Sequence, residues 1–499
     1  MYKDFTYLSE RKMQHFWSNF GIISSYTLVL TFLILCYFDV FDIYYQLSSF
    51  MNQTIRSEKD FMMFEVARKS CIIITFSALM LSLYSYFKEV VSKDTHWETP
   101  FLMILGTICA LIITTAQDLI IIYLCFVVLS LIAQILLAHS KNKFELEAAI
   151  KYFIFDNCIG ILFLLGVALI YLSHGNVSMY IHSIQHIENI SHLNLPISTL
   201  ENAGFTILLI YGCFKLGVPP LHFWVPDVLQ STKMEHSIYL LGILKVPICI
   251  MMIRILKAFP NSEHICQIML WLGVFATFWS AVVNLQQSNI KRIFGYSSIH
   301  QTGFILIAIS IPFGESASII YANTYVILIH IPTMYLLSKL ESISTDNNKY
   351  FLSIDSVKAF SSHSGYHQFL SCVLMLSVAG IPPLAGFFIK LNIFELLIQQ
   401  SYYTALCMVF LSTVVAAFYP FRIISSLFFS EVMKTLAGLK HSVSVEYALA
   451  REFSIHVPST KQHKHFTIDF RFCVIALFVL MNLMYIFSGT FDMEKYLPL

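Results

Sequence analysis

Two copies of one short pattern, Gly-x-Pro-Pro-Leu, lie inside long apolar stretches of this chain, and each has a lysine nearby. The first copy is residues 217–221 with Lys215 just before it, and the second is residues 380–384 with Lys390 after it. A double proline interrupts a helix because it removes backbone donors and clashes with the preceding turn. A lysine in hydrocarbon is costly and is usually kept for a purpose. Paired broken helices in two halves of a membrane protein predict an ion pathway near the midplane.

A third lysine, Lys245, lies within another apolar stretch and close to Pro247. A lysine in such a place can take and give a proton when its hydration or a nearby charge changes. We therefore predict that Lys215, Lys245 and Lys390 form a proton relay. The alternative is that each lysine is paired permanently with a carboxylate and serves only packing.

Acids and histidines in or near the same stretches are candidate counter-ions or relay groups. Histidine is a plausible proton carrier because it titrates near neutrality, although a lone buried histidine is more often a hydrogen-bonded core residue. Lysines near the ends of apolar segments often extend to the interface instead of acting in a pathway. The possible relay or counter-ion residues are Asp156, which is the deepest acid, and Glu147, Lys151, His222, His330 and Glu395.

Composition places the chain among polytopic membrane proteins. Hydrophobic residues make up 57% of it and charged residues only 12%, whereas a soluble domain carries about 25% charge. A net charge of +1 gives no argument for nucleic acid. The chain has no glycine fingerprint or GK[ST] loop for a nucleotide. Its cysteines form no CxxC pair that would indicate an iron–sulfur or zinc site.

The predicted fold is an all-α membrane protein. A span needs roughly 20 apolar residues, and that rule predicts about 13 helices. The segment 368–399 is too long for one straight span, so its double proline predicts two half-helices. The predicted segments are 17–38, 71–87, 100–116, 119–139, 148–172, 203–223, 237–256, 265–285, 293–311, 317–340, 368–399, 404–429 and 472–487.

Charges in the loops predict an orientation. Residues 173–202, 313–316 and 400–403 contain no lysine or arginine. The alternate loops carry the positive charge, which by the positive-inside rule places them on the matrix or cytoplasmic side. These basic residues are Lys141, Lys143, Lys233, Lys291, Arg292, Lys349, Lys358, Lys434, Lys440, Arg451, Lys461 and Lys464.

Four longer motifs then resemble one family. They are residues 146–153 (LEAAIKYF), 214–228 (FKLGVPPLHFWVPDV), 289–299 (NIKRIFGYSSI) and 379–390 (AGIPPLAGFFIK). Together they resemble subunit 2 of respiratory complex I, the proton-pumping NADH:ubiquinone oxidoreductase, from about residue 71 to 429. The lysine at 390 favours this subunit over the antiporter-like subunit that carries a glutamate there. No long lateral helix follows, which argues against the largest such subunit.

The resemblance implies antiporter-like inverted repeats of five helices, each with one broken helix. The implied organisation is N-terminal helices at 1–99, a first repeat at 100–256 broken at 212–223, and a second repeat at 265–429 broken at 368–399. A polar inner loop at 430–471 and a C-terminal helix and tail at 472–499 complete it. In the family, Lys215 would be the switching lysine of the first half-channel, Lys245 the connecting lysine, and Lys390 that of the second half.

The resemblance also implies where the chemistry lies. Flavin, iron–sulfur clusters and ubiquinone would belong to other subunits, so this chain would hold no cofactor or metal. It would contribute proton translocation to an NADH:ubiquinone reductase. Its partners would be the neighbouring antiporter-like subunit, the small membrane subunits and lipids such as cardiolipin, with no nucleic acid. The predicted location is the mitochondrial inner membrane, and the 44 phenylalanines and 26 tyrosines fit an AT-rich genome such as a mitochondrial one.

One position departs from the family. A glutamate that normally pairs with the lysine at 215 aligns with Phe126, and residues 119–139 contain no acid. Either Asp156 or an acid of a neighbouring subunit replaces it, or the pair is lost. We predict that Asp156 lies within salt-bridge reach of Lys215 or Lys151. Two other functions stay open: a free-standing cation/proton antiporter, and a structural subunit that has lost pumping.

Overall fold

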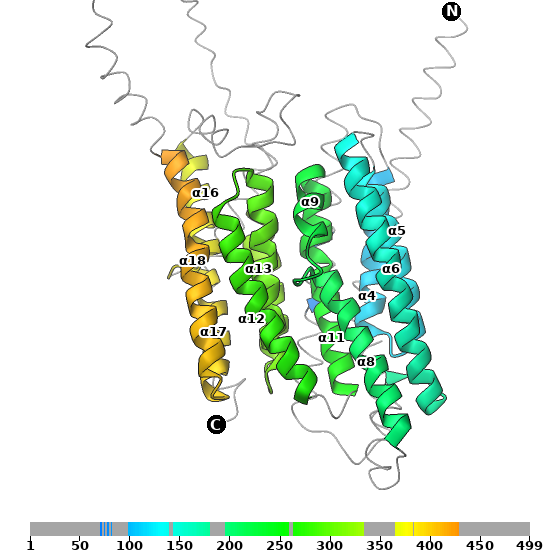
Figure 1. Ribbon diagram of the computed structural model, residues 1–499. Coiled ribbons are helices and arrows are strands. Elements are labelled where there is room, and N and C mark those ends of the chain that lie inside the picture. The colour runs from blue at the N-terminus through cyan, green and yellow to red at the C-terminus, as the bar shows by residue number, and fades with distance from the viewer. Residues whose placement is uncertain are drawn as a thin grey trace, which may run out of the picture.

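The computed structural model describes residues 98–138, 143–179, 195–258, 263–333 and 365–428 except 383, together with six single positions between 70 and 81. These residues form an all-helical bundle (Figure 1). Seven of the described helical segments are long and apolar enough to cross a membrane. The predicted spans at 17–38 and 472–487, most of 71–87 and the polar loop at 430–471 lie outside the described residues.

The helices of the first half follow the predicted segments closely. Helices α6 and α8 begin earlier than predicted. Their first turns contain polar residues, so a prediction from apolar runs leaves those turns out. They are α4 (Glu98–Thr115), α5 (Leu119–Leu137), α6 (Lys143–His174), α8 (Leu195–Leu216), α9 (Trp224–Ser231), α10 (Met234–Ile238), the π-helix η1 (Tyr239–Ile243) and α11 (Lys245–Ala258).

The second half repeats this plan, and it also contains a π-helical segment within a spanning helix. Helices α16 and α17 confirm the prediction that 368–399 is divided into two half-helices. The elements are α12 (Glu263–Leu285), α13 (Ile290–Ser310), α14 (Glu315–Thr324), the π-helix η2 (Tyr325–His330), α16 (Gly365–Ala379), α17 (Ala385–Gln399) and α18 (Tyr403–Phe428).

Each broken helix turns at the glycine of its motif. Gly217 has φ +76° and Gly380 has φ +81°, a region that glycine adopts without steric cost. The first break lies within the predicted bounds of 212–223, because α8 ends at Leu216 and a separate short helix, α9, begins at Trp224. Figure 1 shows α8 leading up to α9 and α16 leading down to α17, so the two broken helices run in opposite directions.

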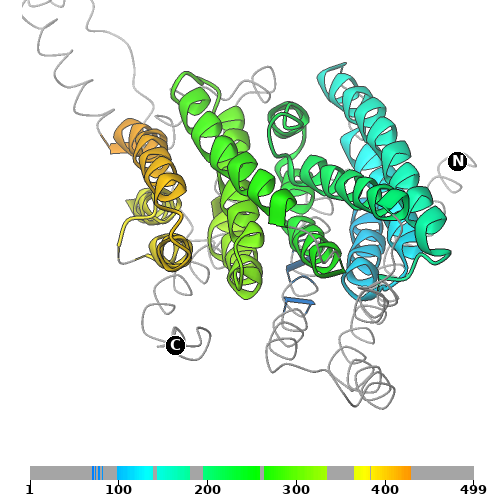
Figure 2. The ribbon, with the colours of Figure 1, turned by 60° about the horizontal axis from the view of Figure 1, so that its bottom comes forward.

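The two halves lie beside each other. In Figure 2 the colours pass from cyan through green to orange across the molecule, so that each half keeps its own group of helices. Helix α9 packs on both α6 and α13. The first broken helix therefore contacts its own half and also the first buried helix of the other half.

Close backbone contact brings α8 against α6. A Cβ atom on Gly204 would lie 2.9 Å from the carbonyl oxygen of Gly166 and 2.7 Å from Ile170 Cγ1. Small residues let membrane helices approach in this way. Because Lys215 lies on α8 and Asp156 on α6, this contact sets how closely the two side chains approach.

In each half, an arginine of the last helix donates hydrogen bonds to the end of the first helix. Arg254 of α11 donates from Nη1 to the carbonyl oxygens of Thr114 (3.0 Å) and Ile113 (3.4 Å) at the end of α4. Arg422 of α18 donates in the same way to Gln287 (3.0 Å) and Leu285 (3.3 Å) at the end of α12. The last carbonyls of a helix lack intrahelical partners, so each arginine satisfies the end of the first helix in its half.

Candidate proton-relay site

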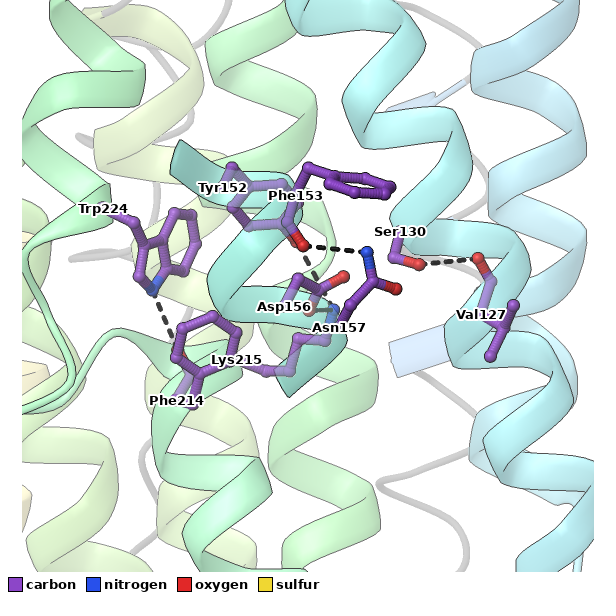
Figure 3. A network of polar contacts seen from close by, with 9 residues as sticks. All are labelled: Val127, Ser130, Tyr152, Phe153, Asp156, Asn157, Phe214, Lys215 and Trp224. Carbon is purple, nitrogen blue, oxygen red and sulfur yellow. Dashed lines mark hydrogen bonds and ion pairs between the residues drawn. The ribbon is translucent and has the colours of Figure 1, made fainter. Parts of the chain in front are cut away.

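A buried ion pair forms the centre of the first half. Lys215 Nζ lies 2.5 Å from Asp156 Oδ1, and the two side chains are only 6% and 3% exposed. Figure 3 shows the lysine extending from the end of α8 to the carboxylate on α6. The prediction that Asp156 lies within salt-bridge reach of Lys215 is confirmed. Lys215 is in the last turn of α8, directly before the break.

Aromatic side chains surround the lysine head. The Tyr152 hydroxyl accepts from Lys215 Nζ at 3.4 Å, and Tyr152 lies one helical turn before Asp156, so both face the lysine. The Nζ atom is also 5.5 Å from the ring centroid of Tyr211 and 5.9 Å from that of Phe126. Aromatic faces attract a cation at this range. The ammonium group is therefore held by one carboxylate within an aromatic enclosure.

Phe126 occupies the place at which the resemblance requires an acid. Its ring faces Lys215 from α5, so the position is the expected one although the residue type is not. The carboxylate comes instead from Asp156 on the neighbouring α6. The following residue, Asn157, is exposed and donates to the Phe153 carbonyl oxygen at 2.9 Å. Of the two neighbouring residues, Asp156 is therefore the one that replaces the missing acid, because it is buried and points to Lys215.

Trp224 links the break to the ion pair. Its Nε1 donates to the Phe214 carbonyl oxygen at 3.2 Å, which ties the start of α9 to the end of α8. Its ring lies 5.2 Å from that of Tyr152. Neither Trp224 nor Tyr152 was predicted as a site residue. The only signal for them was their presence within the matched motifs.

A small cavity of about 30 Å³ adjoins Lys215. Such a volume holds one or two water molecules. The residues that line the cavity include Tyr152, Trp224, Leu240 and Leu244. These two leucines precede Lys245, so the cavity extends from the first lysine towards the helix that carries the second.

Lys245 lies where the two π-helices meet. Its Nζ donates to the Ser298 carbonyl oxygen at 3.2 Å and to the Ser298 hydroxyl, and it lies 5.7 Å from the Tyr325 ring. The Tyr325 hydroxyl and His330 Nδ1 are 3.3 Å apart. His330 packs so closely on Gly242 that a Cβ there would be 2.4 Å from the imidazole ring. The predicted relay residues Lys245 and His330 therefore belong to one cluster.

Lys390 binds the broken end of α16. Its Nζ donates to the carbonyl oxygens of Ala379 (3.2 Å) and Val378 (3.3 Å), which the break leaves free. It also lies 5.9 Å from the Phe304 ring. Glu395, predicted as a possible counter-ion, makes no ion pair with Lys390 in the described part of the chain. Five positions along a helix place two side chains on different sides.

Helix α13 connects the second and third lysines. It carries Ser298 beside Lys245 and Phe304 beside Lys390, with His300 and Gln301 between them. The ring atom His300 Nδ1 lies 3.0 Å from the Thr277 carbonyl oxygen. Within the described residues, His300 Nε2 and Gln301 Nε2 are buried without a partner. Buried polar atoms usually have partners, so these two positions on α13 are unusual.

The remaining candidates lie outside this buried row. Lys151 is half exposed and pairs with Glu147 at 2.7 Å and with Asp227 at 3.7 Å. Asp227 also pairs with Arg292 at 3.4 Å, so this network joins α6, α9 and α13. His222 follows the first break, and its ring lies 6.4 Å from the ring of Tyr296.

Comparison with known proteins identifies the family. Residues 116–416 match the family described as NADH:quinone oxidoreductase/Mrp antiporter, transmembrane. The chain belongs to this antiporter family. NADH-quinone oxidoreductase subunit N of Francisella tularensis subsp. holarctica is 30% identical over 370 residues, which are 72% of this chain and 74% of that protein. The same subunit of Ruthia magnifica is 28% identical over 355 residues, 70% and 72% of the two chains.

Solved structures share the antiporter-family fold. A chain of respiratory complex I from Thermus thermophilus superposes with a TM-score of 0.64 at 20% identity, covering 85% of this chain and 84% of that one. A chain of an archaeal membrane-bound sulfane sulfur reductase gives 0.68 at 20% identity, with 85% and 79% covered. A chain of the Mrp complex from Dietzia gives 0.61 at 15% identity, with 83% and 79% covered. At these identities the likeness concerns the fold alone.

Proposed function

We propose that this chain is a proton-translocating membrane-arm subunit of NADH:quinone oxidoreductase. Electron transfer in other subunits would drive protons along its buried lysines. The observation that carries the proposal is the Lys215–Asp156 ion pair at a helix break, in a family member whose relatives are named subunit N of that enzyme. A buried charge pair at a broken membrane helix is expensive to keep without a function.

In this proposal the ion pair controls when Lys215 holds its proton and when it releases it. While Asp156 contacts Lys215, the carboxylate holds the proton on the lysine, because an opposite charge favours the charged form. When the broken helix or the cavity water rearranges and the carboxylate moves away, the ammonium loses that support. Its proton then moves through the cavity beside Leu240 and Leu244 towards Lys245.

The second and third lysines receive the proton in turn. Lys245 is held by Ser298 and Lys390 by the open carbonyls of α16, so neither has a carboxylate partner among the described residues. His300 and Gln301 on α13 lie between them and would carry the steps from one to the other. Each transferred charge works against the membrane potential at about 2.3 kcal/mol per 100 mV, which makes the pump sensitive to back-pressure.

The rest of the assembly follows from the same proposal. Flavin, iron–sulfur clusters and quinone would reside on other subunits, and this chain would bind the neighbouring antiporter-like subunit and the small membrane subunits. The mitochondrial inner membrane remains the proposed location, supported by the abundance of phenylalanine and tyrosine. Fractionation of cells followed by mass spectrometry of the mitochondrial membranes tests it.

A native gel of solubilised membranes, stained for NADH oxidation, tests membership in the complex. Mass spectrometry locates this chain in the gel, and we expect it in the NADH-oxidising band. If it runs in a smaller band that does not oxidise NADH, the free-standing antiporter replaces the proposal, and cation-coupled transport becomes the assay.

Lysine substitutions then separate a pump from a scaffold. In the assembled complex, Lys215→Met and Lys390→Met should lower the number of protons moved per NADH oxidised, because each removes a titratable group from the row. Lys233→Met, in the connection after α9, is the matched control and should leave that ratio unchanged. An unchanged ratio in both core variants, with normal assembly, would make the chain a structural subunit.

A further inference from the structure

A second and larger cavity lies at the end of the bundle away from α9. It has a volume of about 400 Å³ and lies among the end of α11, the start of α12, the end of α13 and the turn between α17 and α18. Figure 1 shows the ends of α11, α12 and α17 together at the lower end of the molecule. The loop charges place this end on the side opposite the basic loops.

Charged groups of both signs line this cavity. Lys257 Nζ pairs with Glu315 Oε2 at 2.8 Å, and both side chains are about one-third exposed (29% and 34%). Glu263 lies in the first turn of α12 at the same cavity and makes no ion pair in the described part of the chain. Of the described lining residues, Lys257 is the only lysine or arginine. The cavity therefore offers two carboxylates and one ammonium group.

None of the three lysines of the row lines this cavity. Its floor includes Ile309 and Ser310 of α13. Between this floor and Gln301, the side chains Phe304, Ile305, Leu306, Ile307 and Ala308 are all fully buried at 0% exposure. This apolar stretch gives a proton no polar partner along α13 itself.

An exposed apolar stripe of α12 begins beside the cavity. Ile268 is 59% exposed, Trp271 51%, Phe275 49% and Trp279 43%, and their spacing places them on one face of the helix. Gln267, which lines the cavity, directly precedes this stripe. Tryptophan is enriched where membrane meets water. A charged cavity therefore adjoins an apolar surface long enough for acyl chains.

We propose that this cavity and the α12 stripe bind one phospholipid with an amine headgroup, of the phosphatidylethanolamine class. The ammonium group would donate to the carboxylates of Glu263 and Glu315, the phosphate would accept from Lys257, and the acyl chains would cover Trp271 and Phe275. A cardiolipin headgroup fits less well, because two phosphates would meet two carboxylates and a single lysine. A trimethylated choline headgroup has no N–H to donate.

Lipid retention by the intact assembly tests this. The assembly that carries a tagged form of this chain is placed in vesicles of equal parts deuterated phosphatidylethanolamine, phosphatidylcholine and cardiolipin, then extracted again, and retained lipids are counted by mass spectrometry. The unchanged chain should retain phosphatidylethanolamine preferentially. The double variant Lys257→Gln with Glu315→Gln removes two of the three proposed headgroup contacts and both partners of their ion pair together, and it should lower that retention about tenfold.

A second variant and a control keep the result interpretable. Gln267→Trp puts a large side chain at a lining position of the cavity without altering the ion pair and should also lower retention, whereas Lys233→Gln, at the other end of the bundle, should not. Equal retention of the three lipids by the unchanged chain, or unchanged retention in both cavity variants, overturns the proposal. Proton pumping does not enter the readout, so failure here is distinct from failure of the proposed function.

Discussion

At the scale of single residues, the site depends on where one carboxylate is attached. Phe126 and Asp156 both face Lys215, the first from α5 and the second from α6. The ion pair of the family can therefore be made from either helix, provided that one side chain ends in an acid. This chain uses α6. Loss of the acid at position 156 should consequently be compensated by an acid introduced at position 126.

Asp156→Asn should abolish or strongly reduce proton pumping, because it leaves Lys215 buried without a carboxylate, a loss of about 3–5 kcal/mol for a broken buried pair. Adding Phe126→Glu to Asp156→Asn should restore pumping by supplying the acid from α5. The matched control adds Asn157→Asp instead, which places the acid on the exposed side of α6 and should not rescue. Proton-to-NADH ratios in membrane vesicles measure all three. Normal pumping by Asp156→Asn alone would contradict the assigned pair.

At the scale of elements, the contact between α6 and α8 sets the geometry of this pair. Gly204 and Gly166 let the two backbones meet, and Trp224 fixes the start of α9 to the end of α8. The lysine is thereby held at a helix end while its partner sits within a continuous helix. A shift of α8 moves one charge but leaves the other in place.

Gly204→Val should lower both thermal stability and pumping, because the new side chain would overlap Ile170 and the Gly166 carbonyl, at a cost of about 1–3 kcal/mol. Gly160→Val, on the same α6, is the control, since nothing lies within 4 Å of its Cβ position. The melting temperature of the solubilised assembly and its proton-to-NADH ratio check the pair of variants. Equal effects of both substitutions would show that the α6–α8 contact is not the cause.

At the scale of the whole molecule, the protein consists of two halves of similar plan. In each half an arginine joins the last helix to the first, and α9 packs on helices of both halves. Arg254 joins α11 to α4, and Arg422 joins α18 to α12. The network of Lys151, Asp227 and Arg292 connects the halves near the first break. These side chains are about one-third to one-half exposed, so we expect them to add little stability, about 0–1 kcal/mol for each pair.

Arg254→Met should destabilise the chain by about 1.5–3 kcal/mol, the usual value for hydrogen bonds to a charged group. Arg422→Met should destabilise it by less, because the Arg422 side chain is exposed. Because the two arginines act in different halves, the double variant should show the sum of the two effects. Thermal unfolding of the solubilised assembly, followed by loss of its native-gel band, measures this. A double variant no less stable than either single one would contradict independent closure of the halves.

Local sequence determined the elements and the positions of the lysines within them. Long apolar runs predict spanning helices, and the glycine and proline residues of each motif break a helix through effects confined to neighbouring residues. Both broken helices were predictable for this reason, as were Lys215 and Lys390 beside them. The bounds of α8 and α9 were harder to predict, because polar residues can belong to a membrane helix.

Only the tertiary structure decided the partners of these groups. The sequence left Lys215 and Lys151 as alternative partners of Asp156, and the packing of α6 against α8 decided for Lys215. Lys390 binds the carbonyls of Ala379 and Val378 rather than Glu395, and Lys245 meets Ser298 across the boundary between the halves. A pairing between distant segments depends on helix separation and rotation, which arise from all the contacts together, whereas the break at a double proline needs only its own neighbours.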